Sequence, residues 1–317
     1  MCITTRYALA SLFMGVFVAS HTLAQLPQQP AAAPPQQQAV VAPQQQAPPQ
    51  APPGFQLNQL QQEYLDAVLS AWEVHSGKVN TFRCTFERWE YNPTFGPGPD
   101  IPLNKDKGEL SFQKPDKGSF QITEIKRWQA APAPPGQQPP QPAKGDWAVQ
   151  KDAIGEHWVC DGKSVFEYRH DQKQLVERPI PPQFQGQAIV DGPLPFLFGA
   201  EAKKLKDRYW LRVDQQPNQD PNQIWLVALP RFRAQAADFR AVRVILDRQQ
   251  MLPVAMQVQL PDGSRHDYMF DVANATINSP FAKMQQFFER PRIWPGWKRV
   301  VEQAPVEQAA QPAQPPR

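Results

Sequence analysis

Apolar residues recur at two different spacings along the chain, and the spacing changes near residue 80. In the first stretch they recur every three or four positions, at Leu57, Leu60, Tyr64, Ala67, Val68, Ala71 and Trp72. This spacing gives a helix one apolar face, and Gly77 stands where a helix commonly ends. We therefore expect one amphipathic helix at the start of the globular part of the chain.

From Thr81 onward, apolar and polar residues alternate, which is typical of strands with one buried face. Alternating runs include Phe82, Leu110, Phe120, Trp158, Phe166, Val242, Val254 and Tyr268. Turn sequences such as Asp161-Gly162-Lys163 and Pro261-Asp262-Gly263 separate the runs. Roughly nine or ten strands joined by such turns predict a large antiparallel sheet. A sheet of that size curls into a barrel or half-barrel, so the predicted fold class is mainly β (α+β).

Proline is concentrated in three segments. Of the 37 prolines, 19 lie in stretches rich in Gln and Ala at residues 25–54, 129–144 and 303–317. We expect the first to be an extended, disordered linker, the second an insertion at a loop tip and the third a disordered tail. Residues 55–302 then form one globular domain. The chain has nine Trp and 18 Phe, enough for a sizeable core, so a mainly disordered protein is excluded.

The N-terminal residues 1–24 have the pattern of a secretory signal. Arg6 precedes an apolar run, and cleavage is expected before Gln25. An uncleaved inner-membrane anchor is the alternative, since the run is almost long enough to span a bilayer. We expect an exported, periplasmic protein that is soluble after cleavage.

Few residue patterns point to catalysis or metal binding. The four histidines after the signal, His75, His157, His170 and His266, lack the spacing of metal ligands. Gly162-Lys163-Ser164 lacks the preceding glycine of a phosphate-binding loop. A net charge of +3 gives no reason to expect a nucleic-acid partner. The cations and tryptophans at residues 290–299 are expected to form a packed C-terminal segment with a solvated rim. We predict no enzyme, no metal and no cofactor.

The order of the motifs resembles the LolA-type carriers of bacterial lipoproteins and their relatives. Residues 81–86 resemble the first aromatic strand of that superfamily, and residues 108–115 resemble its next strand, which ends in a basic residue and a proline. Residues 160–168 are similar to its Asp-Gly-Lys turn between two aromatic strands. Residues 194–199 resemble its helical lid, and residues 252–274 its late hairpin. The likeness covers residues 57–300, apart from the insertion.

This resemblance implies an unclosed antiparallel half-barrel with an N-terminal helix, short lid helices and an apolar interior that receives acyl chains. The expected partners are the acyl chains of lipids or lipoproteins, bound by a monomer. The implied ligand-binding residues are Phe82, Phe86, Leu110, Phe112, Lys114, Phe120, Trp158, Phe166, Tyr168, Val258, Tyr268 and Phe270, with Phe196, Leu197 and Phe198 in the lid. The alternative is an envelope interaction, sensor or scaffold protein, which uses the same fold to bind envelope membrane proteins.

This chain departs from the carriers in two ways, and the resemblance also bears on its cysteines. The carriers have an arginine before the first-hairpin proline that holds the lid shut, and this chain has Lys114. Lysine lacks the planar fork of arginine, so the latch is expected to be weaker. The Pro/Gln-rich arms also fall outside the carrier pattern. Cys84 and Cys160 would lie three strands apart, roughly 14 Å, which favours free thiols over the disulfide that an oxidising compartment invites.

Overall fold

The computed structural model describes residues 50–132, 144–182, 185–186, 201–215, 219–280 and 288–302. The chain divides into one unit at Met1–Gln50 and another at Ala51–Arg317, and the described helices and strands belong to the second unit. The predicted signal, most of the linker, the middle of the insertion, the predicted lid and the tail lie outside the described residues. In the described part of the chain, no helix combines the length and apolar character that crossing a membrane requires.

Helix α1 (Gln59–Gly77) begins the domain and ends at the glycine that the sequence predicts. At its start, the side chain of Asn58 accepts a hydrogen bond from the Gln61 backbone N–H at 2.9 Å. The side chain of Gln61 accepts one from the Asn58 backbone N–H at 3.0 Å. These reciprocal bonds form a capping box, which satisfies donors that a helix start otherwise leaves unpaired.

The buried face of α1 differs from the predicted one. Leu60 is 76% exposed, whereas Leu65 and Leu69 are almost fully buried beside Val68 and Trp72. The helix has two overlapping apolar faces, both with i, i+3 and i+4 spacing. The buried face is the one with the larger side chains, Leu65, Val68, Leu69 and Trp72. Packing against the sheet selected between the two faces.

One 14-stranded sheet makes up most of the domain, more than the roughly nine or ten strands that turn spacing predicts. Its strands are β1 (Thr81–Tyr91), β2 (Asn104–Gln113), β3 (Lys117–Ala130), β4 (Gly145–Val149), β5 (His157–Asp161), β6 (Ser164–Arg169), β7 (Gln174–Pro179), β8 (Tyr209–Asp214), β9 (Gln223–Pro230), β10 (Ala241–Asp247), β11 (Pro253–Gln259), β12 (Arg265–Phe270), β13 (Thr276–Ile277) and β14 (Lys298–Val301). The short helices among the described residues are α3 (Ala202–Arg208), α4 (Arg233–Asp238) and the 3-10 turn η2 (Val272–Asn274).

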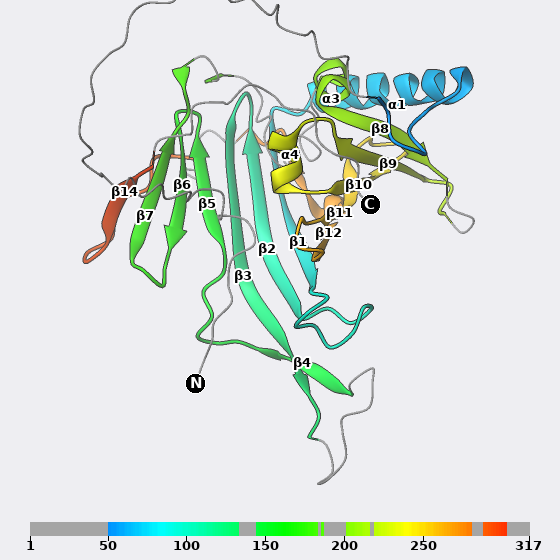
Figure 1. Ribbon diagram of the computed structural model, residues 1–317. Coiled ribbons are helices and arrows are strands. Elements are labelled where there is room, and N and C mark those ends of the chain that lie inside the picture. The colour runs from blue at the N-terminus through cyan, green and yellow to red at the C-terminus, as the bar shows by residue number, and fades with distance from the viewer. Residues whose placement is uncertain are drawn as a thin grey trace, which may run out of the picture. The chain divides into compact units, whose positions relative to one another are not determined.

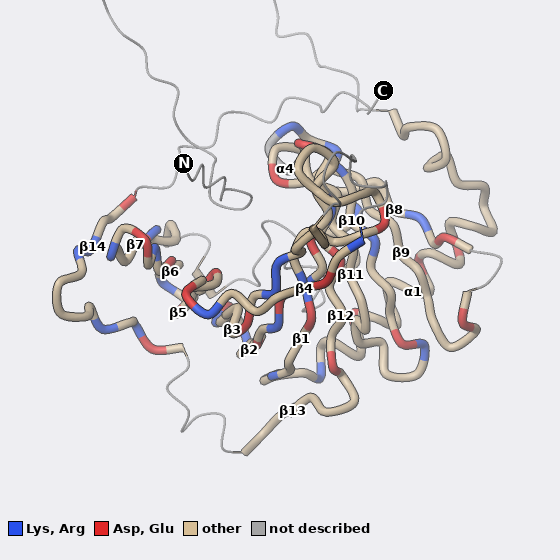
Figure 2. Tube along the Cα trace, turned by 90° about the horizontal axis from the view of Figure 1, so that it is seen from below, with Lys and Arg blue, Asp and Glu red and all other residues tan. Residues whose placement is uncertain are grey.

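The strand order is β14-β7-β6-β5-β3-β2-β1-β12-β11-β10-β9-β8, with β4 beside β3 and β13 beside β1. The pairs are antiparallel except for β14, which lies parallel to β7. β14 and β8 stand at the two ends of this path, so the sheet is unclosed, as predicted. Figure 1 shows the long strands β1–β3 in the centre, and Figure 2 shows that the sheet bends back toward β8.

The register of the central strands defines two faces. Cys84 lies opposite Leu110, Leu110 opposite Phe120, and Phe120 opposite Trp158. Residues directly opposite one another in antiparallel strands point to the same side. We call this side the inner face, because its residues share one apolar core with α1 and with α3.

Strands β8–β12 complete that core. Leu226, Val242, Val244 and Leu246 are fully buried there, and Phe239 joins them. Figure 1 shows α1 and α3 near β8, at this end of the sheet. The helices therefore pack on one part of the inner face, next to β8 and β9.

Candidate functional site

The structure places nine of the predicted ligand-binding residues on the inner face. Eight are buried: Phe82, Phe86, Leu110, Phe112, Phe120, Val258, Tyr268 and Phe270. Trp158 is only partly buried, and it packs against the same core. These residues come from strands β1, β2, β3, β5, β11 and β12, so only the sheet register brings them together.

Three of these rings form a continuous row. The Phe86 and Phe120 rings stack with centroids 4.9 Å apart, and the Phe120 and Trp158 rings stack at 5.6 Å. We call Phe86, Phe120 and Trp158 the inner row. Its rings come from β1, β3 and β5, and it ends at the partly exposed indole of Trp158.

Gly108 of β2 makes the inner row possible. It lies directly opposite Phe86 of β1. A Cβ atom at this position would collide with Cζ of Phe86 and would lie 2.6 Å from the backbone oxygen of Gln121. Because glycine has no side chain, the Phe86 ring can lie over β2 and reach Phe120.

Next to Phe86 of the inner row, the inner face carries charged side chains. Arg88 follows Phe86 on the same side of β1 and has an 8% exposed side chain. Its guanidinium contacts carboxylate oxygens of Asp106 and Glu90 at 2.8 Å each and of Glu156 at 2.9 Å. A buried arginine is tolerated when such partners replace its water.

His266 lies beside this network, with its Nε2 atom 3.9 Å from Oε1 of Glu90. Two buried atoms lack hydrogen-bond partners among the described residues: Oδ1 of Asp106 and Nδ1 of His266. Burial raises the pKa of Asp106 to about 6, although the Arg88 guanidinium opposes the shift. Burial also lowers the pKa of His266 to about 4, against the opposing charge of Glu90. His266 is therefore neutral near pH 7.

Sequence patterns alone did not single out this network. A signal for it is present in β1, where the inward positions run Phe82, Cys84, Phe86 and then Arg88. An arginine at an inward position of a strand needs buried carboxylates nearby, and the alternation alone does not say which ones.

Phe166 and Tyr168 lie on the other face of the sheet. Val159 is opposite Phe166, while Trp158 is opposite Glu167. Neighbours along a strand point to opposite sides, so Phe166 and Tyr168 point away from the inner row. The structure does not bring these two residues together with the other predicted ligand-binding residues.

The C-terminal segment covers Phe166 and Tyr168. The Arg290 guanidinium lies 5.9 Å from the centroid of the Phe166 ring. Tyr168 stacks on His157 at 4.1 Å, and its ring lies 5.7 Å from Trp294 and 6.1 Å from Trp297. His170 contacts the same two tryptophans. We call His157, Tyr168, His170, Trp294 and Trp297 the outer cluster.

Lys114 directly follows β2, and its side chain contacts the C-terminal end of α1. Its Nζ atom donates hydrogen bonds to the backbone oxygens of Ser76 at 3.1 Å and Gly77 at 2.5 Å. A cation at this place satisfies carbonyl groups that a helix end leaves unpaired. The described contacts of Lys114 thus fix α1 to the β2–β3 turn. The predicted lid residues Phe196, Leu197 and Phe198 lie outside the described residues.

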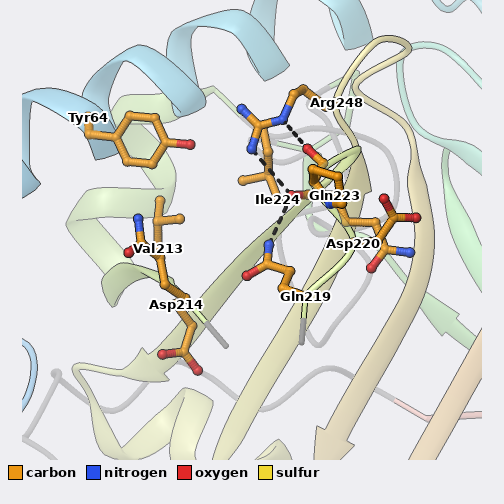
Figure 3. A pocket seen from close by; sticks show the side chains of 10 residues that line it. Tyr64, Val213, Asp214, Gln219, Asp220, Gln223, Ile224 and Arg248 are labelled. Carbon is orange, nitrogen blue, oxygen red and sulfur yellow. Dashed lines mark hydrogen bonds between the residues drawn. The ribbon is translucent and has the colours of Figure 1, made fainter. Parts of the chain in front are cut away.

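Two of the pockets among the described residues are lined by none of the predicted ligand-binding residues. One, of about 250 Å³, lies between Tyr64 of α1 and the β8–β9 connection. Figure 3 shows its polar lining, where Arg248 donates to the Pro221 carbonyl at 2.8 Å and Gln219 to the Gln223 carbonyl at 2.9 Å. The other, of about 350 Å³, lies between the ends of β3 and β4. The rings of Phe86 and Phe120 are buried and stack on their neighbours, so the inner row is packed in this structure.

The two cysteines of the domain are free thiols. Cys84 on β1 and Cys160 on β5 are both buried, three strands apart as expected. Burial raises the pKa of Cys84 to about 12 and that of Cys160 to about 11, so both thiols stay protonated. Within the described ranges, no group of three or more His, Cys, Asp or Glu side chains could hold a metal ion.

No protein-family model matches the sequence, and no curated protein matches it. Among solved structures, the chain is similar to an uncharacterized conserved protein of Thermus thermophilus, with 12% identity, a TM-score of 0.39, and coverage of 75% of this chain and 99% of that one. The complex of MucA and MucB from Pseudomonas aeruginosa matches with 13% identity and a TM-score of 0.33, over 68% of this chain and 58% of that one.

A LolA superfamily protein of Nitrosomonas europaea is also similar, with 8% identity, a TM-score of 0.32, and coverage of 70% of this chain and 97% of that one. The fold itself is established by the strand order and register described above. LolA superfamily structures are thus among those that this chain is similar to, at low sequence identity.

Proposed function

We propose that this chain is an exported, non-catalytic protein that binds an acyl chain of a lipid or lipoprotein on the inner face of its unclosed sheet. The observation that carries the proposal is the inner row, a run of stacked rings that come from three strands and end at a partly exposed tryptophan. Burial of an acyl chain gains about 0.8 kcal/mol for each methylene group removed from water.

The two ends of the inner row differ in burial, and this difference suits the binding of an acyl chain. At Phe86 the row contacts Tyr268 and Phe270, with centroids 6.0 and 6.2 Å away, and α1 shares this core. At Trp158 the row reaches the partly exposed side of β5. In this proposal the acyl chain enters at Trp158 and lies against Phe120.

The entry step requires an exchange of apolar contacts, since the rings are packed in this structure. Protein states that differ by a few kcal/mol respond to a ligand that binds one of them better. In this proposal, we assign the movable lid to the predicted segment at residues 194–199. The predicted signal at residues 1–24 would deliver the protein to the periplasm.

The test is binding of the fluorescent fatty acid cis-parinaric acid to the exported protein and to the variant Trp158→Ala. The variant is expected to bind about tenfold more weakly, which corresponds to about 1.4 kcal/mol of lost contact. The matched control is Trp225→Ala, because Trp225 is also partly buried but lies on β9, where it bonds Gln223 and contacts Arg243.

Urea unfolding of both variants separates a local loss from a loss of the fold. Weak binding in Trp158→Ala alone supports the proposal. It is contradicted if the wild-type protein takes up no probe, or if both tryptophan variants bind as well as the wild type.

A further inference from the structure

We propose that the outer cluster, together with Arg292 and Lys298, docks on the surface of an anionic lipid bilayer. The inner row does not enter this inference, because the two sets of residues lie on opposite faces of the sheet. Trp158 of the inner row and His157 of the outer cluster are neighbours on β5 and point to opposite sides.

A tight turn presents the two tryptophans of the outer cluster. The Trp297 backbone N–H donates to the Trp294 carbonyl at 3.0 Å, and between them lie Pro295 and Gly296. Gly296 has φ of +78°, the left-handed value that the third position of a type II turn requires. The turn fixes the two indoles with centroids 4.9 Å apart.

The base of this turn is held firmly by the sheet. The Lys298 backbone N–H donates to the Lys173 carbonyl at 2.9 Å, and β14 then pairs with β7. Tyr168 and His170 pack beneath the indoles. Trp294 nevertheless remains 46% exposed and its neighbour Ile293 49% exposed. Apolar side chains are thus presented to solvent from a fixed turn.

Between Glu289 and Glu302, every charged residue of the segment is a cation. Residues 290–301 include the cations Arg290, Arg292, Lys298 and Arg299 and no Asp or Glu. Arg290 and Arg299 both contact the carboxylate of Glu177, whose side chain is 8% exposed. No ion pair is found for Arg292 or Lys298 among the described residues, and both side chains are exposed. Two of the cations therefore anchor the segment and two face solvent beside Trp294.

This combination favours a bilayer over a protein as the occupant. Tryptophan rings prefer the headgroup region, where the apolar ring and its polar N–H are both accommodated. Each Lys or Arg near an anionic membrane surface contributes about 1 kcal/mol. A protein partner usually meets a rim of mixed polar residues. Here the exposed side chains of Ile293 and Trp294 lie in a stretch, residues 290–301, whose charged residues are all cations, and the exposed Asp171 follows His170 of the outer cluster.

The experiment is sedimentation of the exported protein with vesicles of phosphatidylcholine alone or of phosphatidylcholine and phosphatidylglycerol in equal parts. The wild-type protein is expected to bind the anionic vesicles, and more weakly as salt is added. The double variant Arg292→Gln/Lys298→Gln is expected to lose roughly thirty-fold in affinity, from about 1 kcal/mol for each cation. Trp294→Ala is expected to lose about tenfold.

Two matched variants complete the design. Phe95→Ala removes an aromatic side chain that is 65% exposed elsewhere on the domain, and it is expected to bind as the wild type does. Trp158→Ala is expected to bind vesicles normally even if it loses cis-parinaric acid, so failure of the proposed function and failure of this inference are distinguishable.

The inference is overturned if the wild-type protein stays in the supernatant with anionic vesicles, a result that would assign the patch to a protein partner. It is also overturned if Trp294→Ala and the double variant bind those vesicles as strongly as Phe95→Ala does.

Discussion

The inner row and the outer cluster are built from the same kinds of side chain, yet they have opposite surroundings. Phe120 and Trp158 lie among apolar side chains that share a core with α1. Tyr168 contacts Trp294, which lies on a segment with exposed cations that Arg290 and Arg299 anchor to Glu177. Aromatic content therefore does not define a site in this fold; the face of the sheet on which each ring lies does.

The arginines of the two faces show the same contrast. Arg88 on the inner face is almost fully buried among three carboxylates. Arg290 on the outer face has a 54% exposed side chain and contacts one carboxylate, that of Glu177. Ion pairs lose strength with exposure to water, so the inner network should matter far more for stability than the outer pair.

The largest expected effect comes from removal of Arg88. Arg88→Met should lower the free energy of unfolding by about 3–5 kcal/mol, because buried carboxylates lose their counter-charge. Arg290→Met should cost at most about 1 kcal/mol, since Arg290 is exposed. Urea unfolding measures both, and equal losses in the two variants would contradict the contrast between the faces.

The next effect tests the geometry of the inner row. Gly108→Ala should lower the free energy of unfolding by about 3 kcal/mol, because the new Cβ would meet both the Phe86 ring and rigid backbone. Gly77→Ala is the matched control, since a Cβ there meets no atom within 4 Å. The account of the row fails if Gly108→Ala is as stable as Gly77→Ala.

A smaller effect is a loss of stability at acidic pH. The folded state lowers the pKa of His266 from 6.5 to about 4, so protonation favours the unfolded chain and stability is lost as the pH falls from 6.5 toward 4. By about pH 5 the loss should reach about 2 kcal/mol. The groups that perturb His266 are Glu90, Arg88 and Asp262.

Asp106 acts with the opposite sign. Its pKa is raised from 3.8 to about 6, so the folded state takes up this proton first and regains stability as the pH falls from 6 toward 3.8. Comparing the wild type with His266→Phe over the same pH range removes the shared contribution of Asp106. If the two unfolding curves depend on pH in the same way, His266 is not the acid-sensitive group.

The smallest expected effect lies far from both sets of rings. β3 and β4 pair up to Ala130 and Gly145, and the Ala131 backbone N–H donates to the Lys144 carbonyl at 2.7 Å. Replacing residues 132–143 by an Asn-Gly turn should keep this pairing and leave the thermal midpoint within a few degrees. A collapse of the fold would show that the insertion is not a loop at a hairpin tip.

Much of the fold could be predicted because its signals are local. The Asp161-Gly162-Lys163 and Asp262-Gly263 turns join antiparallel strands as expected, with φ of +88° at both Gly162 and Gly263. By contrast, β14 pairs with β7 although the two strands are more than a hundred residues apart in the sequence. No local pattern predicts such a parallel partner.

The site was predictable only in part, because register is not local. Alternation correctly marked Phe86, Phe120 and Trp158 as inward residues of their strands, but the phase of β6 relative to β5 depends on how the hairpin closes. A shift of one residue exchanges the faces, which is why Phe166 and Tyr168 were grouped with the inner row. The partners of Arg88 come from β1, β2 and the β4–β5 connection, and only the folded sheet brings them together.

The central claim, that the inner face holds an acyl chain, is tested most directly by native mass spectrometry of the protein purified from the cell envelope. The account predicts adducts of acyl-chain mass that disappear when a lipid-displacing detergent is added. A bare protein mass, with no uptake of offered lipids or lipoproteins, would contradict it and leave the inner row as a filled core.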